Sequence, residues 1–574
     1  MIAKLKITLL LLLSILCTLT YAQQKKNILR NEKINAYQYA ITKQVLCKQG
    51  SVVSAHPLAS QVGLLILKQG GNAIDAAIAT QLALAVVYPG AGNIGGGGFL
   101  VAHLSGGKNI ALDYRETAPA NATRDMYLDA NGNPQTKLSL DGHLSVGIPG
   151  TVAGLFASLK YARLPFRKLV QPAIDLAEYG FAITENEASS FNSTREEFVR
   201  LNTTKPVFVK EGIWKAGDTL IQKDLANTLK RIRDLGAKGF YEGTTAKLIA
   251  AEMERGKGIV RLDDLKNYKA KFRTPVLFSY KGYTIVTMPL PSSGGIVLQQ
   301  MMKMTEGRNI AAMGFETASS VQLMTEIERR AYADRSKFLG DPEFVKVPTA
   351  TLVSKAYLDE RMKDFVPGKA GSSTITAAGI IKESEQTTHL DVYDKEGNAV
   401  AVTTTLNNSF GSKTVVSGAG FLLNDEMDDF SAKPGVPNLY GAIGAEANAI
   451  APGKRMLSSM TPTIVLKGNK PFLVVGTPGG TTITTSVYQT LLDIIEFNLS
   501  AADAVNKPKF HHQWLPDRID VEKGFPEDVR NQLIKMGYQL NERSSIGRTE
   551  LIKISASKIE AVADKRGDDA AEGF

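Results

Sequence analysis

The segment that most constrains the fold spans residues 386–407, which are expected to form two strands folded back on each other. Apolar and polar side chains alternate on both arms, and this period indicates strands rather than a helix. Between the arms, Lys395-Glu396-Gly397 places glycine where a type I turn with a bulge requires a positive φ. Pairing the arms about this turn brings Thr387 opposite Thr405, unless the bulge shifts the register by one position.

Two threonine hydroxyls side by side at a strand end suit an internal cleavage that leaves Thr387 as a new N-terminus. A free α-amine has a pKa of about 7.7 to 8.0, so a useful fraction is neutral near pH 7 and accepts a proton from the adjacent hydroxyl. The same stretch also fits an ordinary hairpin with exposed threonines, because β-branched residues favour strands. The hairpin alone leaves both interpretations open.

Residues 1–22 have the organisation of a secretory signal peptide. Lys4 and Lys6 precede an apolar run over residues 7–19, and Thr20-Tyr21-Ala22 forms a cleavage site of the usual kind. The run is short for a membrane-spanning helix, and no other segment is apolar for about 18 consecutive residues. We therefore expect an exported protein, periplasmic or secreted, without a stable membrane domain.

Composition argues against several classes of partner. The net charge is +10, but both signs are scattered and no long Lys/Arg run occurs, so no nucleic-acid surface is expected.

Removal of the signal peptide would leave Cys47 as the single cysteine, and the mature chain would then contain no internal disulfide.

No cofactor or metal is expected from the motifs. The glycine-rich run 92–98 follows a predicted helix and precedes a strand, whereas a phosphate cradle needs glycines between a strand and a helix N-terminus. The acidic segment 424–430 lacks the ligand spacing of an EF-hand. His511 and His512 are adjacent, so they point to opposite faces of a strand and make a poor metal pair.

Local signals place several other elements. Asn72 followed by Asp75 predicts a capped helix over residues 73–87, and its Ala, Ile and Leu content predicts burial on most sides. Residues 367–374 are typical of a mobile linker some dozen residues before Thr387. There is no regular alternation of strand and helix, which favours an α+β fold.

Arg115 follows the predicted strand 110–112 and allows two interpretations. It either pairs with a neighbour such as Glu116 or points into a pocket, where a guanidinium binds a carboxylate through two hydrogen bonds. The sequence alone slightly favours pairing.

Together, these segments resemble the γ-glutamyltransferases (γ-glutamyltranspeptidases) of the N-terminal-nucleophile hydrolase superfamily. The resemblance covers nearly everything after the signal peptide and rests on motifs in family order. These are Ser54 to Ala59, Gly70 to Ala77, Gly95 to Phe99, Arg115 to Pro119, Gly147 to Thr151, Thr387-Thr388-His389, Met427 to Phe430, Ser458-Ser459-Met460 and Pro478-Gly479-Gly480.

The resemblance implies a four-layer αββα sandwich, with two stacked, mainly antiparallel sheets flanked by helices. It also implies a precursor that cuts itself between Gln386 and Thr387. The products would be a large subunit, residues 23–386, and a small catalytic subunit, residues 387–574, which remain associated as a heterodimer within one compact unit.

The resemblance also assigns roles to residues of this chain. Thr387 is similar to the nucleophile, Thr405 to the threonine that hydrogen-bonds its hydroxyl, and Tyr440 to a residue of the lid loop. The expected substrate-binding groups are Gly479 and Gly480 for the oxyanion, Arg115, Ser458 and Ser459 for the α-carboxylate, and Asn407, Glu426 and Asp429 for the α-ammonium of a γ-glutamyl group.

These roles imply an enzyme that transfers γ-glutamyl groups from glutathione to water or to an amino acid or peptide, without a cofactor. A related acylase cutting another amide, such as a glutaryl side chain, is an alternative, but a glutaryl group lacks the ammonium that Asn407, Glu426 and Asp429 would bind. A second alternative is an inactive periplasmic binding protein that is never cleaved.

Overall fold

The structure is a computed structural model that describes residues 34–373, 387–431, 433 and 446–574. The expected signal peptide, residues 1–22, lies outside these ranges, as do Gln386 of the expected cleavage site and Tyr440 of the expected lid loop.

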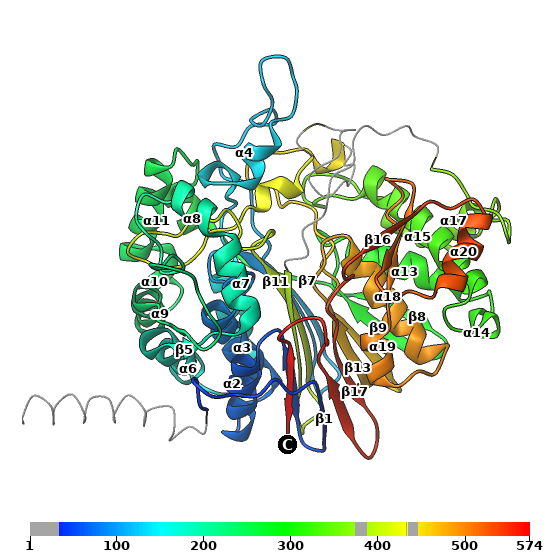
Figure 1. The fold of residues 1–574 in the computed structure, drawn as a ribbon, viewed down its shortest axis with the longest axis horizontal. Coiled ribbons are helices and arrows are strands. Elements are labelled where there is room, and N and C mark those ends of the chain that lie inside the picture. The colour runs from blue at the N-terminus through cyan, green and yellow to red at the C-terminus, as the bar shows by residue number, and fades with distance from the viewer. Residues whose placement is uncertain (1–33, 374–386, 432, 434–445) are drawn as a thin grey trace, which may run out of the picture.

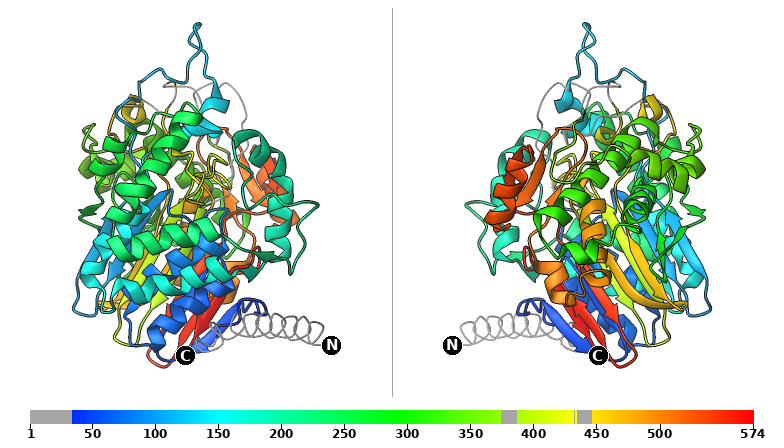
Figure 2. Two further views of the ribbon diagram at one scale, coloured as in Figure 1. Left: turned by 90° about the vertical axis from the view of Figure 1, so that its left-hand side faces the viewer. Right: turned by 90° about the vertical axis from the view of Figure 1, so that its right-hand side faces the viewer.

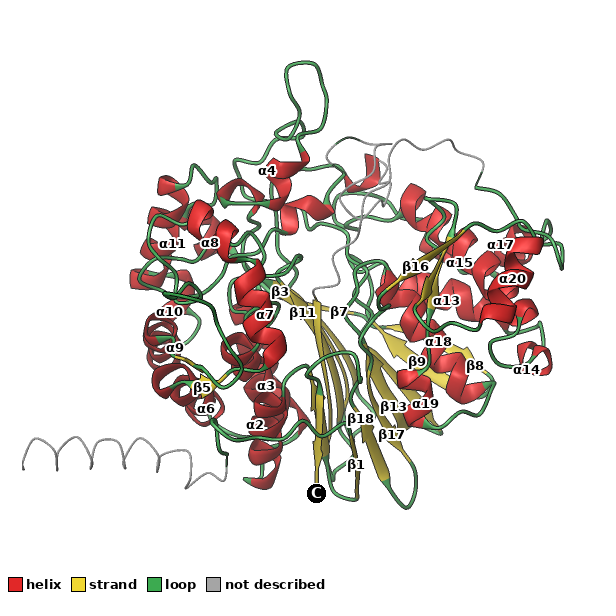
Figure 3. Ribbon diagram, viewed as in Figure 1, coloured by secondary structure: helices red, strands yellow, loops and turns green. Residues whose placement is uncertain are grey.

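Two antiparallel sheets stack face to face between two layers of helices, which confirms the predicted αββα sandwich (Figures 1 and 3). The first sheet has the strand order β19 (Ala570–Gly573), β2 (Ser51–Ser54), β10 (Thr387–Tyr393), β11 (Ala399–Thr405), β3 (Gly97–His103), β4 (Asn109–Asp113) and β7 (Lys271–Arg273). The second has the order β1 (Gln44–Cys47), β18 (Ile559–Val562), β17 (Glu550–Ile554), β13 (Lys470–Gly476), β12 (Thr463–Lys467), β9 (Tyr283–Thr287) and β8 (Val276–Tyr280).

Each sheet is covered by its own helices, which lie in front of it in the side views (Figure 2). Over the first sheet lie α2 (Pro57–Lys68), α3 (Ala73–Val87), α5 (Thr151–Ser158), α6 (Phe166–Tyr179), α9 (Lys223–Leu235), α10 (Lys238–Tyr241) and α11 (Gly243–Arg255). Over the second lie α13 (Gly294–Thr305), α15 (Ala318–Phe338), α17 (Lys355–Arg361), α18 (Thr482–Ile495), α19 (Ala501–Asn506) and α20 (Glu527–Lys535).

Shorter elements connect these layers. They are α4 (Thr136–Leu140), α7 (Glu185–Ser193), α8 (Arg195–Leu201), α12 (Leu262–Asn267), α14 (Ile310–Met313), α16 (Thr349–Leu352), the 3₁₀ helix η3 (Glu426–Asp429), and the strands β5 (Phe181–Ala182), β6 (Thr219–Leu220), β14 (Phe510–His511), β15 (Ile519–Glu522) and β16 (Leu540–Arg543).

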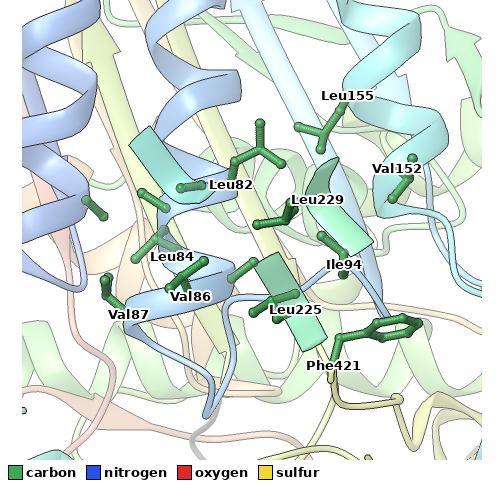
Figure 4. Packing of buried hydrophobic residues seen from close by; sticks show 14 of the residues in the cluster. Leu82, Leu84, Val86, Val87, Ile94, Val152, Leu155, Leu225, Leu229 and Phe421 are labelled. Carbon is green, nitrogen blue, oxygen red and sulfur yellow. The ribbon is translucent and has the colours of Figure 1, made fainter. Parts of the chain in front are cut away.

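The period of two in the strands explains why there are three apolar layers. On β11, Val400 and Val402 pack against the helices of the first layer, whereas Ala399 and Ala401 face the second sheet. Figure 4 shows part of the helix-side cluster, including Leu82 of α3. Both faces of this sheet are therefore buried, which makes its central strands rigid supports for side chains at their ends.

The predicted hairpin register is confirmed. Thr387 lies opposite Thr405 and Tyr393 lies opposite Ala399, without a slip. Gly397 has a φ of 92°, as the turn requires. The two threonines are buried, so the alternative of an ordinary hairpin with exposed threonines is wrong for this chain.

The helix predicted over residues 73–87 is α3, and all fifteen of its residues are buried. Its N-terminus has the expected reciprocal cap, because the Asn72 side chain accepts from the Asp75 backbone N–H while the Asp75 carboxylate accepts from the Asn72 N–H. The backbone N–H of Ala73 donates to Asp394 Oδ2 at 2.8 Å, which fixes α3 to the hairpin turn.

The glycine run serves close packing in this fold. A Cβ on Gly96 would lie 2.1 Å from the carbonyl oxygen of Thr405, and one on Gly98 would lie 2.5 Å from that of Thr403. Only glycine allows the chain to approach the end of β11 this closely.

The linker prediction is wrong for residues 367–373, which are held at several points. The N–H of Ala370 donates to the Met536 carbonyl at 2.8 Å, and that of Ser373 donates to Asp517 Oδ2 at 2.7 Å. Composition missed these contacts because their partners lie more than 140 residues away in the sequence.

The described ranges contain no helix with the length and apolar content needed to cross a membrane. They also contain no group of three or more His, Cys, Asp or Glu side chains placed to hold a metal ion.

Asp394→Ala should destabilise the protein by about 3 kcal/mol, since its carboxylate accepts from the backbone N–H groups of Ala73, Glu396 and Asn398. The free energy of unfolding from urea titration measures this loss. Lys395→Ala changes an exposed side chain in the same turn and should stay within about 0.5 kcal/mol of wild type. Equal losses in the two variants would contradict the role of Asp394.

Candidate active site

Thr387 and Thr405 lie at the ends of the paired strands β10 and β11 and line one cavity. The other lining residues come from segments far apart in the sequence: Arg115, Arg335, Ser336, Leu339, Asn407, Asp429, Phe430, Ser431, Asn448, Leu457, Ser458, Ser459, Met460, Gly480, Thr481 and Ile483. Most of the side chains predicted from the sequence are therefore gathered around one opening.

Among the predicted residues that the structure describes, Glu426 and Gly479 are not part of the cavity lining, but each adjoins it. Glu426 is fully buried and forms an ion pair with Arg115, with Nη1 to Oε2 at 2.5 Å. Gly479 directly precedes the lining residue Gly480. Glu426 therefore supports the cavity from behind its wall.

Arg115 is the charge centre of the cavity. Besides Glu426, its guanidinium contacts the carboxylate of Asp429, which is 20% exposed, and lies 3.7 Å from that of Glu116. Burial alone would lower the pKa of Arg115, but its acidic neighbours, Glu426 and Asp429 foremost, outweigh burial and raise the pKa. The guanidinium therefore stays charged.

The structure combines the two interpretations of Arg115. It lines the cavity and also pairs with acidic side chains, closely with Glu426 and Asp429 and at 3.7 Å with Glu116. Glu116 is fully buried and is not among the residues that line the cavity. Burial raises the pKa of Glu116 to about 8, with Arg115 opposing the shift. Its carboxyl group therefore holds its proton near neutral pH.

The two serines lie on the wall next to Arg335. Arg335 donates from Nη2 to Ser459 Oγ at 3.0 Å and from Nε to Ser293 Oγ at 2.9 Å. Ser458 Oγ accepts from the backbone N–H of Met460 at 3.1 Å. The wall thus combines hydroxyl groups with a second guanidinium, a set that suits an anionic ligand group.

Asn407 is connected to the threonine pair through its backbone. Its N–H donates to Thr405 Oγ1 at 2.8 Å, and its side-chain amide donates to the Asp425 carbonyl at 3.1 Å. Asn407 has a φ of 79°, an uncommon conformation that asparagine tolerates better than most residues. The segment after β11 therefore turns back into the cavity.

The glycine pair has positive φ angles, 134° at Gly479 and 56° at Gly480. The Gly479 carbonyl accepts from the backbone N–H of Thr482 at 3.0 Å and from its hydroxyl at 2.7 Å. In a trans peptide the N–H points away from the preceding C=O, so the Gly480 N–H is directed away from α18. A backbone donor so placed is suited to stabilising a developing oxyanion.

The family model for gamma-glutamyltranspeptidase matches residues 59–574. The chain belongs to the gamma-glutamyltranspeptidase family. Over 537 residues it is 47% identical to the glutathione hydrolase proenzyme of Escherichia coli, covering 92% of this chain and 93% of that protein.

Solved structures agree with this membership. Cephalosporin acylase from Bacillus halodurans superimposes with a TM-score of 0.82 at 26% identity, over 94% of this chain and 98% of the acylase. The gamma-glutamyltranspeptidase of Helicobacter pylori gives a TM-score of 0.56 at 46% identity, over 59% of this chain and 97% of that one. This gamma-glutamyltranspeptidase family member is therefore an enzyme whose fold is shared with acylases.

The sequence motifs did not point to Arg335 or Asn448. Arg335 lies near the end of the long helix α15, where nothing in the helical period marks it, and Asn448 ends the short 3₁₀ helix η4 (Glu446–Asn448). The Asn448 side chain joins Asp429 to Leu457, since it donates to the Asp429 carbonyl at 2.7 Å and accepts from the Leu457 N–H at 3.0 Å. No local signal predicts these contacts.

Glu116→Gln should become more stable relative to wild type as pH rises from 5 to 8.5. An unfolded glutamate has a pKa of about 4.3, so the unfolded chain loses this proton before the folded chain does. The stability contributed by protonated Glu116 is present below that value and is lost as pH rises through about 8. The amide that replaces the carboxyl group cannot ionise, so the variant avoids this loss.

Thermal midpoints at the two pH values measure this effect. Glu211→Gln, at an exposed position, should follow wild type at both. A difference between Glu116→Gln and wild type that does not change with pH would show that Glu116 is already ionised at pH 5.

Proposed function

We propose that this chain is an exported glutathione hydrolase and γ-glutamyltransferase that cleaves itself between Gln386 and Thr387. The observation that carries the proposal is the position of Thr387, which begins β10 at the cavity, opposite Thr405 and near Arg115. Cleavage there would free an α-amine beside a hydroxyl already held by a rigid sheet.

The reaction then follows from the groups at the cavity. The Thr387 hydroxyl attacks the γ-amide carbon while its proton moves to the α-amine. The N–H groups of Gly479 and Gly480 stabilise the oxyanion, the C–N bond breaks, and the leaving nitrogen takes the proton. A γ-glutamyl ester of Thr387 remains, which water or the amine of an amino acid or peptide attacks to regenerate the hydroxyl.

The charges around the cavity fit the zwitterionic end of a γ-glutamyl group. In our proposal Arg115, Ser458 and Ser459 bind the α-carboxylate. The α-ammonium binds to Asn407, Glu426 and Asp429. Fixed separation between these groups and Thr387 would place the γ-amide at the nucleophile. Tyr440 belongs to the proposed lid over this site.

Relatives support the proposed maturation. The similar Escherichia coli protein is named a proenzyme, and the Helicobacter pylori chain, matched over 97% of its length, spans 59% of this chain. We propose that residues 1–22 direct export and are removed, and that residues 23–386 and 387–574 remain together as a heterodimer in the periplasm or outside the cell.

Acylase activity is the second candidate, because cephalosporin acylase shares the fold over nearly the whole chain. A glutaryl amide would leave the partly exposed carboxylate of Asp429 without a cation from the substrate. Comparing turnover of γ-glutamyl and glutaryl anilides separates the two functions, and faster turnover of the glutaryl compound would favour the acylase.

Thr387→Ala should abolish both the cleavage and the turnover of a γ-glutamyl anilide, because the attacking oxygen is removed. Denaturing electrophoresis should show one full-length band, whereas wild type gives two, one of them starting at Thr387. A wild-type chain that remains uncleaved and inactive would instead support a binding protein. Turnover by Thr387→Ala would show that another group is the nucleophile.

Thr388→Val is the matched control. Thr388 is the adjacent strand residue, points to the other face, and has a buried hydroxyl without a hydrogen-bond partner among the described residues. This variant should still be cleaved and active.

Gly479→Ala should lower kcat by about 100-fold or more, since its Cβ would lie 2.3 Å from Thr482 Oγ1 and alanine disfavours a φ of 134°. Gly468→Ala is a control with a positive φ and open space around its Cβ, and it should cost about 1 kcal/mol in stability while leaving kcat unchanged. A Gly479→Ala enzyme with normal kcat would exclude the oxyanion role.

A further inference from the structure

Thr481 connects the glycine pair to a network of buried polar groups. It directly follows Gly480 and lines the cavity, yet its own polar atoms point away to other elements. Its hydroxyl donates to Gln513 Oε1, and its carbonyl accepts from the hydroxyl of Tyr332 on α15. Thr481 is thus held through both its side chain and its backbone.

His511 lies beside both Gln513 and Thr481, and its Nε2 is 3.3 Å from the Thr481 hydroxyl. The amide nitrogen of Gln513 donates to the Leu515 carbonyl at 3.1 Å, so Gln513 Oε1 is the atom that faces Thr481 and His511. This oxygen only accepts, and His511 Nε2 lies 3.0 Å from it, so a proton on Nε2 completes this hydrogen bond. Nδ1 lies 2.8 Å from the hydroxyl of Thr485 on α18.

Burial favours the neutral form of this histidine. His511 is 2% exposed, and burial lowers its pKa to about 4. An uncharged ring with its proton on Nε2 therefore donates to Gln513 throughout the neutral pH range, without adding a charge behind the cavity.

The hydrogen bonds around Thr481 fix the orientation of three consecutive peptide groups. The carbonyl of Gly479 binds Thr482, that of Gly480 accepts from the Ile483 N–H at 3.3 Å, and that of Thr481 binds Tyr332. Because consecutive peptide planes share a Cα atom, rotating one of them would disturb the hydrogen bond made by the carbonyl of the next. Because the Gly480 N–H is antiparallel to the Gly479 carbonyl, this network sets the direction of that N–H.

We propose that His511 and Gln513 are positioning residues for the Gly479–Gly480 pair, acting through the hydroxyl of Thr481. The inference rests on the proposed function, in which these N–H groups stabilise the oxyanion. The network contributes by holding the donors before the reaction begins, so that no reorganisation is needed as negative charge develops.

His512 provides an internal comparison. It is as deeply buried as His511, but its ring lies against Asp517 and accepts from the Trp514 N–H at 3.1 Å, and its backbone N–H donates to Glu328 at 2.9 Å. None of these contacts reaches Thr481, so His512→Phe removes a buried imidazole without touching the proposed network.

The first experiment compares kcat and KM for a γ-glutamyl anilide among four cleaved variants. His511→Phe and Gln513→Leu should lower kcat by about 10- to 100-fold, since a misplaced donor loses most of its effect, while KM changes much less because the groups binding the zwitterion are untouched. Gln513→Glu keeps an acceptor oxygen for both donors and should retain most of kcat. His512→Phe should keep kcat near wild type.

Equal kcat values in His511→Phe and His512→Phe, or in Gln513→Leu and Gln513→Glu, would overturn the positioning role. A wild-type enzyme that turns over no γ-glutamyl donor would refute the proposed function instead. If His511→Phe does not fold, the comparison of Gln513→Leu with Gln513→Glu provides the test, because Gln513 is only partly buried and its substitution disturbs the core less.

The second experiment does not depend on activity. Nitrogen-15 NMR of histidine-labelled wild type, assigned by comparison with His511→Phe, reports which ring nitrogen of His511 is protonated. A neutral ring with the proton on Nε2 from pH 5.5 to 8 is expected. A proton on Nδ1, or a doubly protonated ring in this range, would overturn the network.

Discussion

The pairing of β10 with β11 is the interaction on which the site depends. Thr387 and Thr405 face each other because the strands are in a fixed register, and that register is held on both sides, by β2 next to β10 and by β3 next to β11. A slip of one residue would turn Val400 and Val402 away from the helix-side core. Burial of both sheet faces thus fixes the threonine pair more firmly than any contact of the threonines themselves.

The cavity wall contains buried charged groups, and these groups compensate one another within the protein. Arg115 is nearly inaccessible, yet it keeps its charge because Glu426 and Asp429 contact it directly. Burial raises the pKa of Glu426 well above its ordinary value, so its negative charge depends on Arg115 and on whichever cation enters. A zwitterionic ligand would bring both signs of charge to groups that already compensate each other.

The two ends of the reaction path are supported by different layers. Thr387 is positioned by the first sheet, whereas the glycine pair lies between β13 and α18 and is braced by α15 and the segment around His511. In the proposed mature enzyme, α15 would belong to the large subunit and the other elements to the small one. Association of the two subunits would therefore be required for an oriented Gly480 N–H as well as for the substrate pocket.

Local chemistry allowed much of this molecule to be predicted from sequence. The alternation of side chains and the glycine in the turn determined the hairpin register, and Asn72 with Asp75 determined the start of α3, because such signals act over a few residues. The family resemblance also named eight of the eighteen residues that line the cavity. The tertiary structure alone decided the close pairing of Arg115 with Glu426 and Asp429 and the presence of Arg335 and Asn448 at the cavity. It also decided the contacts of residues 367–373 and the link from His511 to the glycine pair. Those contacts join residues far apart in the chain, and their partners are set by how whole layers pack rather than by any pattern along the sequence.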